Sequence, residues 1–196
     1  MKEIYIDLDR TILNTDRLYY DMDKTTKKYG ISLERFNKVK NQIFTEPILF
    51  NYVKVIEYIC NNDNINLKIL DELNKILDNC DNYLYEDVQM FFKNCKQKGY
   101  KINILTYGDL NFQLMKLKNL SIYKSIDSVI ISSIFKFDLN LNYTNKIFID
   151  DNPRDLIGLY NKKAKVIRLI RENCKYSKIK LNEKIITCHN LNDIKL

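Results

Sequence analysis

Short apolar runs rich in isoleucine and valine recur along the chain, and stretches with helical spacing separate most of them. Such runs, bounded by polar residues, are typical of buried strands. They predict strands at residues 3–6, 101–105, 128–132, 146–149, 165–170 and 184–187. Helices are expected between them at 86–97, 110–117 and 154–160. This alternation predicts an α/β fold, a Rossmann-like parallel sheet with helices on both faces.

The segment from Thr15 to Asn82 breaks the alternation because it holds only helical patterns. Apolar residues recur at helical spacing at 16–28, 33–43 and 67–77, and another helix is expected to begin at Pro47, since proline suits a first helical turn. We therefore expect an α/β core of residues 1–14 and 83–196, interrupted by a helical insert of residues 15–82.

Composition restricts the expected location of the protein and the kinds of catalytic or metal site it can hold. No apolar run is long enough to span a membrane, and the three apolar residues before Asp7 are too few for a secretion signal, so a cytoplasmic protein is expected. The five cysteines form no CxxC pair and are expected to be free thiols. His189 is the only histidine, which argues against Ser-His-Asp hydrolysis and multi-histidine metal sites.

Positive charge is concentrated at the C-terminal end. Residues 161–196 carry ten lysines and arginines against three acidic residues, an excess equal to the net charge of +7 for the whole chain. Such a segment can bind nucleic acid or another acidic partner. Because no aromatic residues are interleaved with the charges as in nucleic-acid sites, a solvated basic surface is the preferred interpretation.

Polar side chains follow the predicted strands. They are Asp7 and Asp9 after the first, Thr106 after the second, Lys136 soon after the third, and Asp150, Asp151 and Asp155 at or after the fourth. Because ligands bind outside the carboxyl ends of parallel strands, these side chains are expected to share one site. Crowded carboxylates favour a hard cation such as Mg²⁺, and a hydroxyl and a lysine would hold phosphoryl oxygens. The set predicts phosphoryl transfer.

Three segments resemble motifs of the haloacid dehalogenase superfamily. "IYIDLDRT" is similar to motif one, "INILT" to motif two and "IFIDDNPRD" to the acidic motif four, and they occur in the family's order. The helical insert has the position of the family's helical cap. The resemblance covers essentially the whole chain and implies a phosphatase that forms an aspartyl-phosphate.

The resemblance also implies a role for each matching residue. Asp7 would be the nucleophile, and Asp9 the general acid and base. Family members that dehalogenate lack a carboxylate at the position of Asp9, which favours a phosphatase. Thr106 and Lys136 would bind phosphoryl oxygens. The metal ligands would be Asp7, the backbone carbonyl of Asp9, and Asp151, supported by Asp150 or Asp155.

Two positions stay open. Arg10 stands where small residues are frequent in the family; its side chain could reach phosphate, but a solvent-facing side chain is the preferred interpretation. The family's motif three supplies a lysine, and for this role Lys136 is preferred. Lys146 begins a strand and should point away from the site, and Lys124 precedes the third strand.

The favoured prediction is Mg²⁺-dependent hydrolysis of a small phosphorylated metabolite, with the insert closing over the site. A phosphomutase would use the same residues, and a nucleotide or nucleic-acid end phosphatase would add the basic segment. A phospho-receiver or other phosphate-binding module gathers similar residues, but its phosphorylated aspartate lies on a later strand. The carboxylate of Asp9, two residues beyond Asp7, argues against a phospho-receiver module.

Overall fold

The computed structural model describes residues 2–44, 49–181 and 184–196. These residues form one sheet with the order β3-β2-β1-β4-β5-β6. Its strands are β1 (Lys2–Ile6), β2 (Tyr100–Tyr107), β3 (Ser128–Ser132), β4 (Ile147–Asp150), β5 (Lys165–Leu169) and β6 (Ile186–Cys188). All neighbouring strands pair in parallel, which confirms the predicted α/β, Rossmann-like fold.

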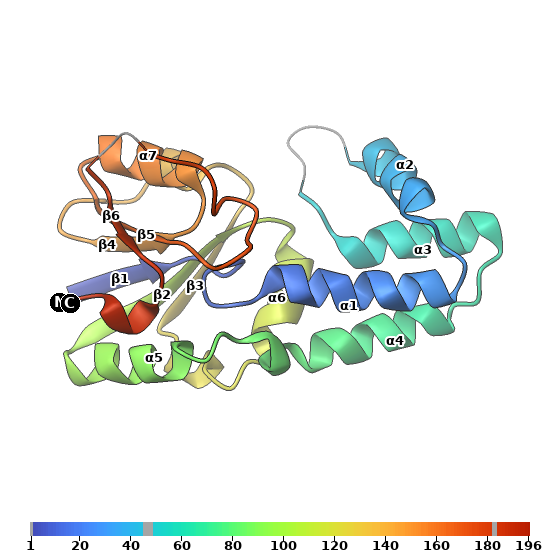
Figure 1. The fold of residues 1–196 in the computed structure, drawn as a ribbon, viewed down its shortest axis with the longest axis horizontal. Helices are drawn as coiled ribbons and strands as arrows, with labels where there is room; N and C mark the ends of the chain where they lie inside the picture. The colour runs from blue at the N-terminus through green and yellow to red at the C-terminus, as the bar shows by residue number, and fades with distance from the viewer. Residues whose placement is uncertain (1, 45–48, 182–183) are drawn as a thin grey trace.

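Helices cover both faces of the sheet. The helix α5 (Val88–Gln97) lies on one face and α7 (Pro153–Asn161) on the other, while α6 (Leu110–Lys118) follows β2 (Figure 1). The two faces belong to separate cores because side chains alternate along each strand. In β1, Ile4 and Ile6 join the larger core with α5, whereas Tyr5 joins the smaller core with α7.

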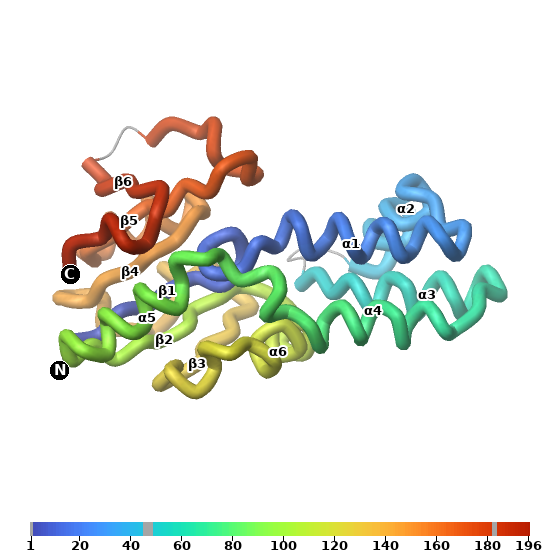
Figure 2. Tube along the Cα trace, turned by 60° about the horizontal axis from the view of Figure 1, so that its bottom comes forward, coloured from blue at the N-terminus to red at the C-terminus, as the bar shows by residue number. Residues whose placement is uncertain are grey.

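An elongated helical insert extends from the end of the sheet opposite the two chain termini (Figures 1 and 2). It consists of α1 (Thr15–Lys28), α2 (Leu33–Ile43), α3 (Tyr52–Asp63) and α4 (Lys68–Asp78). The predicted helix start at Pro47 is wrong for α3: the helix begins at Tyr52, because the Asn51 side chain accepts a hydrogen bond from the backbone N–H of Lys54. Pro47 itself lies outside the described residues. Within those residues, no helix is long and apolar enough to cross a membrane.

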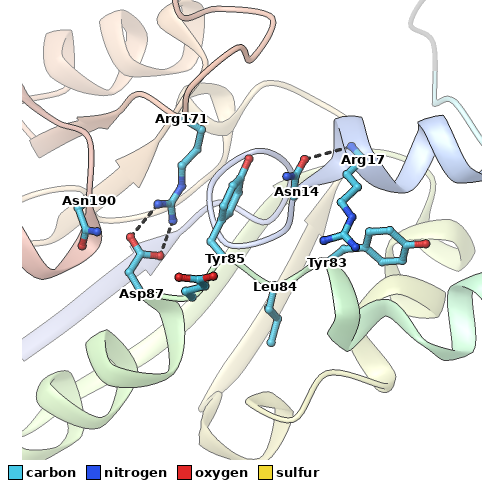
Figure 3. Close-up of a pocket in the computed structure, with 9 residues that line it drawn as sticks. Asn14, Arg17, Tyr83, Leu84, Tyr85, Asp87, Arg171 and Asn190 are labelled. Atoms are coloured by element: carbon cyan, nitrogen blue, oxygen red, sulfur yellow. Dashed lines mark hydrogen bonds and ion pairs between the residues drawn. The ribbon is translucent and has the colours of Figure 1, made fainter.

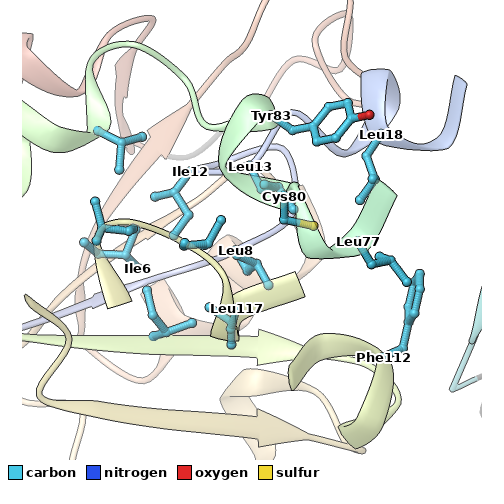
Figure 4. Packing of buried hydrophobic residues seen from close by; sticks show 14 of the residues in the cluster. Ile6, Leu8, Ile12, Leu13, Leu18, Leu77, Cys80, Tyr83, Phe112 and Leu117 are labelled. Atoms are coloured by element: carbon cyan, nitrogen blue, oxygen red, sulfur yellow. The ribbon is translucent and has the colours of Figure 1, made fainter. Parts of the chain in front are cut away.

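The larger apolar core continues from the sheet into the insert (Figure 4). Ile6 and Leu8 come from the first strand and its end, Leu13 from the connection into the insert, and Leu18 and Leu77 from α1 and α4. Each is at most 1% exposed. Because burial of such a side chain stabilises a fold by about 1.5–3 kcal/mol, packing holds the root of the insert against the sheet.

A buried ion pair fastens the connections between the insert and the sheet (Figure 3). Arg171, which follows β5, donates to both oxygens of Asp87 at 2.7 and 2.8 Å and to the backbone carbonyl of Thr11. Asp87 also accepts the backbone N–H of Leu191 at 2.8 Å. The guanidinium group lies 3.9 Å from the ring centroid of Tyr85. Thr11 precedes the insert and Asp87 follows it. These contacts therefore join both connections of the insert to the C-terminal part of the chain.

Candidate active site

The carboxyl ends of the central strands meet at a cavity of about 150 Å³. Every side chain that the sequence predicted for the site lines this cavity: Asp7, Asp9, Thr106, Lys136, Asp150, Asp151 and Asp155. Asp7 directly follows β1, Thr106 lies near the end of β2, and Asp150 ends β4. Lys136 reaches the cavity from η3 (Lys136–Asp138), a short 3-10 helix after β3. The parallel sheet thus brings distant segments to one edge.

Lys136 lies among the carboxylates. Its ammonium group binds Asp7 and lies 2.6 Å from Oδ2 of Asp150. Burial alone would lower the pKa of Lys136, but the charges of Asp150 and Asp7 raise it well above its ordinary value, so the ammonium is charged. Lys146 instead pairs with Glu3 at 2.8 Å, at the start of β1 and away from the cavity.

Asp7, Asp150 and Asp151 form a buried carboxylate cluster in which one oxygen of each lies within 4.8 Å of the others. Burial raises the pKa of Asp151, and the charges of Asp7 and Asp150 raise it further. Burial likewise raises the pKa of Asp7, against the opposing charge of Lys136. Oδ2 of Asp151 is buried and has no hydrogen-bond partner among the described residues. Such a cluster fits a divalent cation with oxygen ligands.

Asp150 and Asp155 are more fully engaged by protein groups. Asp150 binds Lys136 and accepts the backbone N–H of Asn152 at 2.8 Å. Asp155 accepts the backbone N–H of Lys136 and the side-chain amide of Asn152, each at 3.1 Å. These contacts fix η3 against the start of α7. They leave Asp7 and Asp151 as the carboxylates with most capacity for a cation.

Asp9 is held by side chains that the sequence analysis did not identify. Nζ of Lys116 lies 2.5 and 2.7 Å from the two oxygens of Asp9. The hydroxyl of Thr15 and the amide of Gln113 donate to the same carboxylate at 2.6 and 2.9 Å. Burial would raise the pKa of Asp9, but Lys116 and these hydrogen bonds lower it to about 2. Asp9 is therefore an anion at neutral pH.

The helical pattern of α6 contains a signal for Lys116. Phe112, Gln113, Lys116 and Leu117 are all buried, and they recur at the spacing of one helix face. A lysine on a buried face requires an anionic partner. Gln113 also donates to Oγ1 of Thr106 at 2.9 Å, so α6 contacts both the motif-one and the motif-two side chains.

Arg10 lines the site and does not simply extend into solvent. Its side chain is 19% exposed and lies 2.7 Å from Asp16 in an ion pair. It borders both the cavity at Asp7 and a larger adjoining cavity of about 590 Å³. The two cavities share lining residues that include Asp9, Tyr19 and Tyr107, so they lie side by side in one cleft.

Asp109 connects the insert to the sheet beside this cleft. It caps α6 by accepting the backbone N–H of Phe112 at 2.9 Å. The amide of Asn51 and the ammonium of Lys54 also donate to it, each at 2.8 Å. The first turn of α6 and the start of α3 thus share one carboxylate.

Known proteins are similar to this chain in sequence and in fold. The family described as haloacid dehalogenase-like hydrolase matches residues 4–169. The chain is similar to a candidate pyrophosphatase, PpaX, of Clostridium perfringens (strain 13 / Type A), with 25% identity over 183 residues that cover 84% of this chain and 82% of that protein.

Two solved structures show the same fold. One is a candidate haloacid dehalogenase-like hydrolase from Burkholderia xenovorans LB400, with a TM-score of 0.74 and 14% identity over 97% of this chain and 95% of that chain. The other is a HAD phosphatase from Thermococcus onnurineus, with a TM-score of 0.68 and 20% identity over 98% and 95% of the two chains. Together with the family match over most of the sequence, the fold and the three motifs lead to one conclusion: this chain belongs to the haloacid dehalogenase-like hydrolase family.

Proposed function

We propose that this hydrolase is a Mg²⁺-dependent phosphatase that acts on a small phosphorylated metabolite through an aspartyl-phosphate on Asp7. The observation that carries the proposal is the buried contact between Asp7 and Lys136, beside the carboxylates of Asp150 and Asp151. A phosphoryl group on Asp7 would lie next to the Lys136 ammonium and the hydroxyl of Thr106, which stabilise its charge. The similarity to a candidate pyrophosphatase supports chemistry at phosphorus.

The proposed reaction has two displacements. A carboxylate oxygen of Asp7 attacks phosphorus, the bond to the leaving oxygen breaks, and the leaving oxygen takes a proton from Asp9 where it needs one. Asp9 then removes a proton from water, whose oxygen attacks phosphorus as the bond to Asp7 breaks. Inorganic phosphate leaves and Asp7 is restored. The anionic Asp9 held by Lys116 is in the form that the second displacement requires.

Mg²⁺ would be held by Asp7, Asp151 and the backbone carbonyl of Asp9, with Asp150 and Asp155 in support. The unpartnered buried oxygen of Asp151 supports this assignment. When bound, the ion would neutralise charge on the phosphoryl oxygens.

The insert would act as a cap over the site. Tyr19 from α1 and Phe50 before α3 line the cleft, where they would exclude water around the substrate. Arg168 and Arg171 of the basic segment are buried, which leaves less positive charge at the surface for a nucleic acid. Both observations favour a small substrate over a polymer.

The test is phosphate release from p-nitrophenyl phosphate. We expect turnover with Mg²⁺, loss of turnover in EDTA, and no detectable turnover by Asp7→Asn. Asp71→Asn, at an exposed position of α4, is the matched control and should behave as the unmodified protein. Turnover by a folded Asp7→Asn protein would exclude the covalent mechanism.

A further inference from the structure

We infer that the larger cavity beside Asp7 binds the nucleoside monophosphate part of a nucleoside diphosphate. The terminal phosphorus is attacked, its bond to the bridging oxygen breaks, and that oxygen keeps the electron pair and leaves with the nucleoside monophosphate. Water supplies the oxygen of the inorganic phosphate released. This inference rests on the proposed phosphatase function and names its substrate class.

Two groups of aromatic rings line the cavity. Tyr19, Phe50 and Phe112 form one group, with ring centroids 6.0–6.4 Å apart. Tyr107 and Phe135 form the other, stacked at 6.0 Å with their planes 9° apart. Phe112 is buried and the other four rings are half-buried. Phe135 also stacks on Phe137, with ring centroids 5.5 Å apart. Aromatic surface that lines a cavity favours a flat ligand group that can stack on it, such as a nucleobase.

Two cations at the same cavity suit a second negative charge on the ligand. Arg154 and Lys175 line it, and neither forms an ion pair with a carboxylate of the described residues. The guanidinium of Arg154 lies 3.5 Å from the ring centroid of Phe135, so a cation and an aromatic ring are presented together. Lys116, by contrast, is already bound to Asp9. A phosphate in the leaving group would pair with the two available cations.

The cavity distinguishes a nucleoside diphosphate from its fragments. Pyrophosphate would pair with Arg154 and Lys175 but would leave the aromatic groups uncovered. A nucleoside monophosphate, with its phosphate at Asp7, would cover the rings but leave the two cations unpaired. Only the diphosphate offers both a base and a second charged group.

The experiment compares kcat/KM for ADP, AMP and pyrophosphate with Mg²⁺ present. We expect ADP to exceed both fragments by about tenfold or more, since stacking one base contributes roughly that factor. Phe135→Leu should lower kcat/KM about tenfold for ADP and by a smaller factor for pyrophosphate. Arg154→Gln should lower it for ADP and pyrophosphate but not for AMP. Lys162→Gln, at an exposed position after α7, is the control and should change none of the three.

Equal kcat/KM for ADP and pyrophosphate, with p-nitrophenyl phosphate still turned over, would overturn this inference and leave the phosphatase intact. If no substrate is turned over, binding of the methylene-bridged analogue of ADP is measured against methylenediphosphonate. Preference for the nucleotide analogue would keep the site and reject the phosphatase. Equal binding, or none, would reject the site.

Discussion

Lys116 sets the charge of Asp9, and its replacement tests how that charge is used. In Lys116→Met the ammonium is lost, and burial then raises the pKa of Asp9 above its present value of about 2. A larger fraction of Asp9 then carries a proton as the pH falls. We expect kcat/KM of the variant for glycerol phosphate, relative to p-nitrophenyl phosphate, to rise from about pH 8 to about pH 5, because only the alkoxide needs a proton on leaving. At each pH in this range the ratio should be lower for the unmodified protein, because a smaller fraction of its Asp9 carries a proton.

The same pair has an effect on stability that can be measured separately. The pKa of Asp9 is lower in the fold than in the unfolded chain, where it is near 3.9, so the pair stabilises the fold above about pH 4. That contribution is lost as the pH falls toward 2. Lys118→Met, exposed on the same helix, is the control. A Lys116→Met protein that matches this control in both the activity ratio and the pH dependence of unfolding would contradict the assignment.

At the scale of elements, α7 and η3 must lie very close together. A Cβ atom on Gly158 of α7 would lie only 2.1 Å from a ring carbon of Phe137. Gly158→Ala should push the two elements apart, cost about 1–3 kcal/mol of unfolding free energy, and displace Lys136 from Asp7. We expect kcat to fall more than KM rises, as measured by steady-state kinetics and urea unfolding.

Tyr160→Ala, at a 40% exposed position of the same helix, removes a side chain without a clash and serves as the comparison. If Gly158→Ala lowers stability but leaves kcat unchanged, the close packing does not position Lys136.

The local sequence was enough to predict the helices and strands and the edge of the sheet where the candidate active site lies. It was not enough to predict which side chains of a distant helix contact that site. The predicted strands lie within two residues of the observed ones, and Asp7 and Asp150 could be placed because strand ends define the edge of a parallel sheet. Lys116 could not, since its partner Asp9 lies 107 residues away and only tertiary packing brings α6 to it. The start of α3 was misplaced because Asn51, as a cap, outweighs the apolar spacing before it.

At the scale of the whole molecule, the Arg171–Asp87 pair joins the insert connections to the C-terminal segment. Arg171→Met would leave the charge of Asp87 buried without a partner, at an expected cost of about 3–5 kcal/mol in the free energy of unfolding. Lys178→Met, exposed in the same segment, should cost little. Urea unfolding compares the two, and an equal midpoint for both variants would show that the pair does not hold these parts together.

Asp109 links the insert to the helix that holds Asp9. It binds Asn51 and Lys54 of the insert and also caps α6, the helix that carries Gln113 and Lys116 to Asp9. An opening movement that draws the start of α3 away from the sheet has to break these contacts and loosen the first turn of α6. The position of the insert and the hydrogen bonds of Asp9 would then share a single coupling free energy. A change made at the mouth of the cleft would thus alter the surroundings of the Asp9 carboxylate without touching it.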